Sequence, residues 1–345
     1  MIAAEARKAT KLSVRCRAGS LLSAAVSIAA LTGVPAHAAE NGVSFYLLGS
    51  KSVSSGILPP PGIYLQNDVY YNEGSLSASR DLPLNGKITA GLRVKTWVEM
   101  PTLIWSTPLQ VLGGNVVFMG IFPTGGPSVD VGAVLTGPKG GVIGQNVHDS
   151  IFTIGDPVFG SSIGWHAGDF HWNVGMLVNA PIGDYRNGAL ANLSFNHWAE
   201  DFNASFTWLD SKTGLEISNS FGVIFNQIND ATQYRTGTQF HYEGGVIWHM
   251  PNNFAFGVVG YYLDQLSADS GPGAVLGPFK SRAAAIGGYA GYTFKAGELP
   301  VTTSIKVFQE FNVRNRLENG VAGFFTIGIP LSVASSAPAA SIPRR

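Results

Sequence analysis

Over most of the chain after residue 60, apolar and polar side chains alternate with a period of two. Residues 214–226 show this most clearly. One parity carries Leu215, Ile217, Phe221, Val223 and Phe225, interrupted by Asn219, and the other carries Glu216, Ser218, Ser220, Gly222 and Asn226, interrupted by Ile224. Because successive side chains of a strand point to opposite faces, this pattern predicts a β-strand with one apolar face.

The same period recurs often enough to predict an all-β protein. About twelve strands are expected, at residues 63–71, 87–99, 113–122, 155–167, 171–180, 202–209, 214–226, 238–249, 254–266, 282–295, 300–312 and 319–331. Many reach the roughly 9–11 residues that a tilted strand needs to cross a bilayer, whereas strands of soluble proteins average about 5–6 residues. An even strand number is typical of bacterial outer-membrane barrels.

The connections between these strands differ in length. Short ones at 167–170, 210–213, 251–253 and 296–299 alternate with long ones at 72–86, 123–154, 181–201, 227–237 and 267–281. Short periplasmic turns and long extracellular loops are typical of transmembrane barrels, and a β-sandwich does not sort its loops in this way. The connection 100–112 is the exception, because it is long where a short turn is expected.

Charged residues on the polar parity are expected inside such a barrel, because charge is costly in the bilayer. These lumen candidates are Arg93, Lys95, Glu99, Glu216, His241, Glu243, Lys306 and Glu310. They either pair across strands or line a substrate path. Aromatic residues near strand ends are expected to form interfacial girdles, and they include Tyr70, Tyr71, Trp97, Trp165, Trp172, Trp208, Trp248, Tyr261 and Tyr262.

The first 38 residues have the features of a secretory signal peptide. A basic stretch precedes the apolar run 21–34, and Ala36-His37-Ala38 fits the small-x-small cleavage rule. The whole chain has 22 basic and 22 acidic residues, so cleavage before Ala39 would remove five basic residues and one acidic one and leave a net charge of −4. It would also remove Cys16, the only cysteine. We therefore expect an exported, mildly acidic protein of a Gram-negative envelope.

Residues 39–62 precede the first predicted strand and are rich in Gly, Ser and Pro. They contain an apolar patch of four residues, Phe45, Tyr46, Leu47 and Leu48. A ring of about twelve strands has a lumen wide enough to need filling or to conduct. The segment is therefore a candidate plug, although it could instead lie at the periplasmic mouth. The Ala/Ser/Pro-rich residues 333–345 are predicted to be a disordered tail.

Other chemistry is only weakly indicated. Gly160-Ser161-Ser162-Ile163-Gly164 matches the nucleophile elbow of hydrolases, but no helix is predicted after it. His241, Glu243 and His249 share a strand face, yet the two histidines would lie about 26 Å apart at 3.3 Å per residue, too far for one metal ion. Four aspartates in long connections match no calcium-loop spacing, namely Asp130, Asp149, Asp156 and Asp184. We expect no cofactor, no metal site and no catalytic residue.

Several short strings together resemble one family. They are residues 59–64 (PPPGIY), 155–157 (GDP), 164–166 (GWH), 181–185 (PIGDY), 192–198 (NLSFNHW), 213–218 (TGLEIS), 232–237 (TQYRTG) and 260–266 (GYYLDQL). Over roughly residues 40–331 the chain resembles the outer-membrane β-barrel family named for the meta-pathway of phenol degradation. The resemblance implies a transporter of aromatic or other hydrophobic compounds.

The sequence therefore predicts a transmembrane antiparallel β-barrel of the cell outer membrane that passes small hydrophobic or aromatic compounds passively. The alternatives are a non-conducting structural barrel and, with less support, an outer-membrane hydrolase using Ser162. Expected partners are outer-membrane lipid and lipopolysaccharide, the barrel-assembly machinery and the small substrate. The low content of charged residues, 13%, and the absence of a basic patch argue against binding to nucleic acid.

Overall fold

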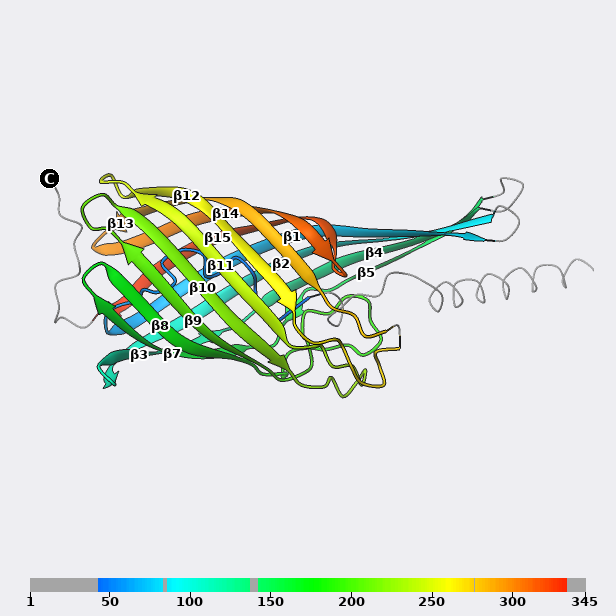
Figure 1. Ribbon diagram of the computed structural model, residues 1–345, viewed down its shortest axis with the longest axis horizontal. Coiled ribbons are helices and arrows are strands. Elements are labelled where there is room, and N and C mark those ends of the chain that lie inside the picture. Colours follow the sequence, from blue (N-terminus) through cyan, green and yellow to red (C-terminus); the bar gives the residue numbers. More distant parts are fainter. Residues whose placement is uncertain (1–42, 83–85, 137–141, 276, 334–345) are drawn as a thin grey trace, which may run out of the picture. The chain divides into compact units, whose positions relative to one another are not determined.

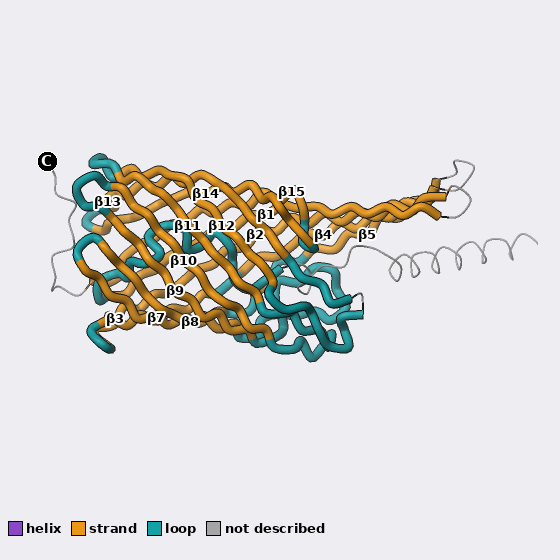
Figure 2. Tube along the Cα trace, in the orientation of Figure 1, coloured by secondary structure: helices purple, strands orange, loops and turns teal. Residues whose placement is uncertain are grey.

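The structure is a computed structural model that describes residues 43–82, 86–136, 142–275 and 277–333. The predicted signal peptide (1–38), residues 39–42 and residues 334–345 of the predicted tail lie outside the described residues. Every regular element of the described part is a strand (Figure 2). Within these ranges there is no helix long and apolar enough to span a membrane.

Twelve of the strands form a closed antiparallel barrel (Figure 1). Neighbouring strands follow the order β1, β15, β14, β13, β12, β11, β10, β9, β8, β7, β3 and β2, and the pairing of β1 with β2 closes the ring. The strands of the ring are β1 (Gly62–Leu82), β2 (Gly86–Val111), β3 (Gly114–Ile121), β7 (Val158–Ala167), β8 (Phe170–Asn179), β9 (Ala199–Leu209), β10 (Leu215–Asn226), β11 (Gln239–His249), β12 (Phe254–Gln265), β13 (Arg282–Ala296), β14 (Leu299–Arg314) and β15 (Glu318–Val333). They correspond one to one to the twelve predicted strands.

Three further strands were not predicted. β4 (Thr124–Thr136) and β5 (Val142–Ser150) lie within the expected long loop 123–154, and β6 (Thr153–Ile154) pairs with β4. Contact within the chain divides it into two compact units. One contains the described parts of 77–92 and 131–147, which belong to β1, β2, β4 and β5, and the other contains the described residues of 37–76, 93–130 and 148–345, which include the barrel.

The exceptional connection 100–112 is not a loop. β2 continues to Val111, and the turn to β3 consists of Leu112 and Gly113, which both adopt positive φ (52° and 76°). Short turns therefore lie at one end of the barrel, at the left in Figure 1, and the longer connections 180–198, 227–238 and 266–281 lie at the other. The predicted long connection 72–86 is largely strand as well.

The outer face of the barrel is apolar and its interior is largely polar, as the alternation along β10 and β11 shows. Phe221 and Val246 are about half exposed (49% and 51%), whereas Glu216 and Glu243 are completely buried. The outward Asn219 accepts a hydrogen bond from Tyr242 Oη (2.6 Å). The inward Ile224 packs in an apolar cluster with Leu263 and Phe308. Tyr242 thus provides a partner for the polar Asn219 on the outer face, and the interior apolar cluster accommodates Ile224 on the inner face.

Candidate functional site

Residues 43–61, here called the N-terminal segment, run through the interior of the barrel. The structure gives them hydrogen bonds to side chains of β2, β8, β9, β10, β11 and β14. The first turn of the segment is also apolar, and Tyr46 and Leu48 are buried in the interior cluster. In Figure 1 the blue trace of this segment lies among the strands of the barrel. The lumen and the segment that fills it are therefore the candidate site.

Glu243 of β11 holds the middle of the N-terminal segment. Its two carboxylate oxygens accept hydrogen bonds from the Tyr46 hydroxyl (2.9 Å) and the Lys51 backbone N–H (2.7 Å). His241, two residues away on the same face, stacks against the Tyr46 ring at 3.7 Å between centroids and is bound to Asp201 (2.8 Å). A charged acceptor is thus matched to two donors of the segment, which is the stronger class of hydrogen bond.

Lys306 of β14 also binds the segment, as a cationic donor where Glu243 is an anionic acceptor. Its ammonium group donates to the carbonyl oxygens of Gly49 (2.5 Å) and Ser50 (3.1 Å) and lies 4.8 Å from the centre of the Phe324 ring. Gly49 has a φ of +92° and touches Phe308. A side chain at Gly49 would be strained and would start 2.7 Å from that ring, so glycine is required at this close approach.

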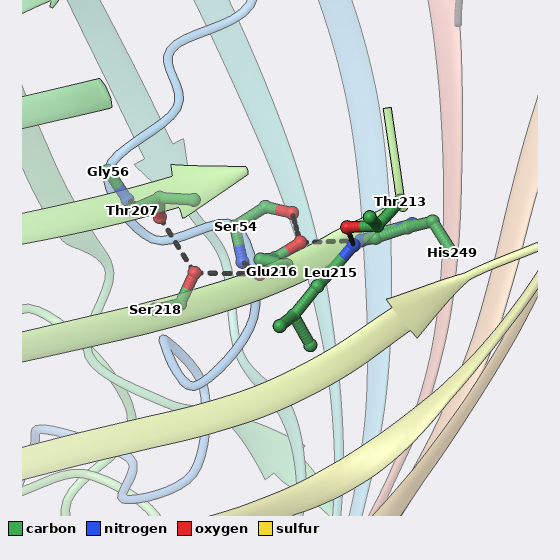
Figure 3. A network of polar contacts seen from close by, with 8 residues as sticks. All are labelled: Ser54, Gly56, Thr207, Thr213, Leu215, Glu216, Ser218 and His249. Carbon is green, nitrogen blue, oxygen red and sulfur yellow. Dashed lines mark hydrogen bonds and ion pairs between the residues drawn. The ribbon is translucent and has the colours of Figure 1, made fainter. Parts of the chain in front are cut away.

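Glu216 of β10 holds the next part of the segment (Figure 3). It accepts bonds from the backbone N–H (2.6 Å) and hydroxyl (3.0 Å) of Ser54, and from Ser218 (2.7 Å) and His249 (2.6 Å) of the wall. Beside it, the Gly56 N–H donates to Thr207 Oγ1 (2.9 Å). The carboxylate has a full set of donors although it is completely buried, which offsets the cost of removing its charge from water.

The wall is shaped to let the segment's backbone approach. A Cβ atom built on Gly245 of β11 would lie 2.3 Å from the Ser52 carbonyl oxygen, and one on Gly164 of β7 would lie 2.6 Å from Leu58. Conversely, a Cβ atom on Gly56 would lie 2.4 Å from the Thr207 nitrogen. No larger residue fits at these contacts without moving the segment, so wall and segment are complementary.

The segment also carries titratable groups into this polar interior. Burial raises the pKa of the Tyr46 hydroxyl, and the carboxylates of Glu243 and Asp201 raise it further, so Tyr46 stays a donor. Burial lowers the pKa of the Lys51 ammonium, while the charges of Asp201 and Glu243 oppose that shift. Lys51 Nζ donates to Asn203 Oδ1 (2.9 Å).

Of the eight predicted lumen residues, the structure places five inside the barrel. Glu216, His241, Glu243 and Lys306 hold the N-terminal segment or the wall around it, as described above. Glu310 of β14 is also inward and accepts a hydrogen bond from the Tyr261 hydroxyl (2.7 Å). All five form hydrogen bonds within the barrel. The sequence had left open whether such residues pair with one another or line a substrate path.

The prediction is wrong for Arg93, Lys95 and Glu99, which lie on the outer face of β2. They share the parity of Trp97 and Trp105, whose exposures are 54% and 51%, whereas the opposite parity is inward. Both parities of this part of β2 contain apolar residues, so the pattern was assigned to the wrong face.

On the outer face, two of these side chains, Lys95 and Glu99, interact with β1. Lys95 pairs with Glu73 (3.8 Å), and Asn67 donates to Glu99 (2.8 Å). Because charge facing hydrocarbon is costly, we infer that this part of β2 lies beyond the apolar band of the barrel.

The four residues of the apolar patch differ in how deeply they are buried. Tyr46 and Leu48 are buried, and Phe45 and Leu47 are partly buried against the same interior cluster. The patch thus packs against the barrel interior.

An aromatic cluster on the inner wall was missed by the sequence analysis. Tyr70 and Phe324 have ring centres 5.0 Å apart, Tyr261 and Phe308 are 5.1 Å apart, and Phe308 and Phe324 are 6.2 Å apart. Tyr70 and Tyr261 were expected in the interfacial girdle. The alternation along β14 could have revealed this cluster, because Phe308 lies on the same inward face as Lys306 and Glu310.

Two aspartates, the buried Asp156 and the partly exposed Asp149, fix the long connection 180–198. Asp156 accepts hydrogen bonds from the backbone N–H groups of Gly183 (2.9 Å), Phe195 (2.7 Å) and Asn196 (3.1 Å) and is only 2% exposed. Asp149 accepts from the N–H of Ala191 (3.0 Å). Both aspartates therefore hold the connection through hydrogen bonds to its backbone.

The hydrolase motif is not in the geometry that its chemistry needs. Gly160–Gly164 lies inside β7, and Ser162 is an inward residue of that strand rather than the residue of a strand-to-helix turn. His241, Glu243 and His249 bind Asp201, the N-terminal segment and Glu216, respectively. Among the described residues, no group of three or more His, Cys, Asp or Glu side chains is arranged to hold a metal ion.

The comparisons with known proteins agree with this architecture. The family model described as "Putative MetA-pathway of phenol degradation" matches residues 77–324. A crystal structure of an outer membrane channel from Pseudomonas putida F1 is 12% identical, with a TM-score of 0.60 over 82% of this chain and 99% of that chain. No curated protein matches the sequence.

Two further structures are more distant. The CymD monoaromatic hydrocarbon channel is 8% identical, with a TM-score of 0.39 over 79% of this chain and 89% of that chain. A FadL homologue of Pseudomonas aeruginosa is 9% identical, with a TM-score of 0.34 over 78% of this chain and 90% of that chain. The fold is therefore that of an outer-membrane channel, a conclusion that rests on the first structure.

Proposed function

Because the chain belongs to the phenol-degradation MetA-pathway family, we propose that it is an outer-membrane channel for the uptake of small hydrophobic or aromatic compounds. The observation that carries this proposal is the content of the lumen. The barrel interior is filled by a separate segment, bound through hydrogen bonds to Glu216, Glu243 and Lys306, rather than by side chains of the wall alone. Such a segment can move while the barrel remains closed.

The mechanism that this arrangement supports is passive. The compound enters at the end of the barrel that carries the long connections, meets the aromatic cluster of the inner wall, and passes once the N-terminal segment is displaced. Water can replace each hydrogen bond between segment and wall, so the net cost of opening is far smaller than the gross strength of these bonds. No covalent step is part of this function.

The same features support the proposed location. The half-exposed aromatic and aliphatic residues around the barrel form a surface that lipid would cover. The predicted signal peptide supports export, and the outer membrane of a Gram-negative bacterium with its lipopolysaccharide is the proposed environment. Assembly there would use the barrel-assembly machinery.

The test is uptake into proteoliposomes. We expect a small aromatic compound such as toluene or benzoate to enter vesicles that contain the protein faster than empty vesicles, and a variant lacking residues 43–58 to admit it faster still. In the cell, deletion of the gene would slow growth on a limiting aromatic carbon source. Equal uptake with and without the protein would refute the proposal.

One observation favours a second candidate, a structural barrel that does not conduct. The N-terminal segment is tightly fitted, with glycines where backbone meets backbone. If this is the function, the intact protein would show neither uptake nor single-channel current in a planar bilayer. Only the variant without residues 43–58 would conduct.

A further inference from the structure

A cleft of about 390 Å³ opens on the outer face of the barrel, where β1 lies between β2 and β15. It is lined by Tyr71, Glu73, Gly74, Ser75, Arg93 and Val321. Glu73 pairs with Val321, and Ser75 pairs with Glu318, the first residue of β15, so the cleft lies toward the end that carries the long connections. Its volume is within the range of about 300–1,000 Å³ that is typical of small-molecule sites.

The charges at the cleft leave one cation unused. Glu73 accepts a hydrogen bond from the Tyr71 hydroxyl (2.8 Å) and pairs with Lys95 (3.8 Å). Among the side chains that the structure describes, the exposed Arg93 forms no ion pair. A guanidinium keeps its charge at neutral pH, and its planar set of donors fits the oxygens of a phosphate group. The cleft can therefore bind an anion without breaking a pair that already exists.

The surface beside the cleft is apolar. Val321, Phe325 and Leu331 lead along the outer face of β15 from the cleft toward the short turns, and they are between 39% and 54% exposed. Such a face is covered by lipid in a transmembrane barrel. Tyr71, at the cleft itself, is the amphipathic type of residue that lies at the level of the headgroups. A molecule in the cleft would thus have acyl chains on one side and the charge of Arg93 on the other.

From this arrangement we propose that the cleft binds the lipid A part of lipopolysaccharide, with a phosphate group on Arg93 and acyl chains along the outer face of β15. A soluble anion would use Arg93 but gain nothing from the apolar face, whereas lipid A carries phosphate groups and acyl chains together. The long connections mark the outer end of such a barrel, and lipopolysaccharide forms the outer leaflet there. The inference rests on the proposed location in the outer membrane and is independent of transport.

The experiment is native mass spectrometry of the full-length processed protein in detergent, which counts the lipid molecules bound as their concentration rises. The probes are diphosphorylated lipid A and the same lipid without its phosphate groups. We expect the phosphorylated lipid to bind more tightly. Arg93→Gln should weaken its binding about fivefold, the effect of one arginine near an anionic membrane surface, and leave the dephosphorylated lipid unchanged.

The matched control is Arg314→Gln. It removes an exposed arginine from the last residue of β14, toward the same end of the barrel, that does not line the cleft. This variant should bind both lipids as the parent protein does. Equal affinity of the parent protein for the two lipids, or equal losses in Arg93→Gln and Arg314→Gln, would overturn the inference.

Glu73→Gln tests the sign of the effect. It removes the carboxylate of the cleft and releases Lys95, so phosphorylated lipid A should bind more tightly than to the parent protein. This variant keeps the inference testable if Arg93→Gln fails to fold, as shown by loss of the heat-dependent gel shift of barrels. Unchanged or weaker binding in Glu73→Gln would count against the site.

Inorganic phosphate in excess distinguishes the lipid from a free anion. It lacks acyl chains and should leave lipid A bound, whereas displacement would show a phosphate site and refute the assignment to a lipid. The outcome is also separate from the proposed function. Uptake of toluene by a protein that does not bind lipid A would refute the site and leave the channel, and lipid A binding without uptake would do the reverse.

Discussion

Neutralising the two carboxylates that hold the N-terminal segment should release it from the barrel. Glu216 accepts two hydrogen bonds from Ser54, and Glu243 accepts one each from Tyr46 and Lys51. Glu→Gln keeps the size and one acceptor oxygen of each side chain but removes the charge, and it places an NH₂ group opposite one of the segment's donors. The variant Glu216→Gln/Glu243→Gln therefore weakens binding of the segment with little change of volume.

The size of the effect follows from the class of hydrogen bond. A bond to a charged group contributes about 1.5–3 kcal/mol and a neutral one about 0.5–1.5 kcal/mol, and the midpoints differ by about 1.3 kcal/mol. Counting one weakened bond for each carboxylate, each substitution should cost about 1.3 kcal/mol. This corresponds to about a tenfold larger population of the released segment for each single variant and about 100-fold for the double variant, provided that the two sites act independently.

Cysteine labelling measures this population. The only cysteine, Cys16, lies in the predicted signal peptide, so Ser52→Cys introduces a single thiol at a fully buried position of the segment. The rate of reaction with a maleimide reagent then reports how often the segment leaves the wall. We expect the rate to rise about 100-fold in the double variant. Glu298→Gln, in the exposed turn between β13 and β14, is the control and should leave it unchanged.

The result that refutes this reasoning is a double variant that keeps its folded gel mobility and labels at the rate of the parent protein. Such a result would mean that packing of Tyr46 and Leu48, rather than the two carboxylates, retains the segment. Fast labelling of the parent protein itself would show that the segment does not remain in the lumen at all.

Three other substitutions test separate parts of the structure. Gly245→Val would place a Cβ atom 2.3 Å from a carbonyl oxygen of the N-terminal segment and should raise single-channel conductance in planar bilayers, whereas Gly288→Val, whose Cβ meets nothing within 4 Å, should not. Phe221→Lys, on the outward face, should destabilise the barrel in lipid vesicles by about 2–4 kcal/mol in urea titrations, and a small effect would contradict the outward orientation. Asp156→Asn should loosen the connection 180–198, so that trypsin cleaves after Arg186 faster than in the parent protein, and equal cleavage rates would show that Asp156 does not hold it.

The sequence by itself determined the twelve strands of the ring, because the period of two is a local property of neighbouring residues. Residues 214–226 could be assigned a lipid face and a lumen face, since their parities differ sharply in polarity. Around Val98 both parities contain apolar residues, so the local pattern could not orient Lys95 and Glu99, and only their partners on β1 do so.

The contents of the lumen were decided by tertiary structure alone. The apolar patch 45–48 marked the N-terminal segment as unusual, but its partners lie far along the chain: Glu243 is 192 residues from Lys51, and Lys306 is 257 residues from Gly49. No periodicity links such positions, because closure of the barrel brings them together.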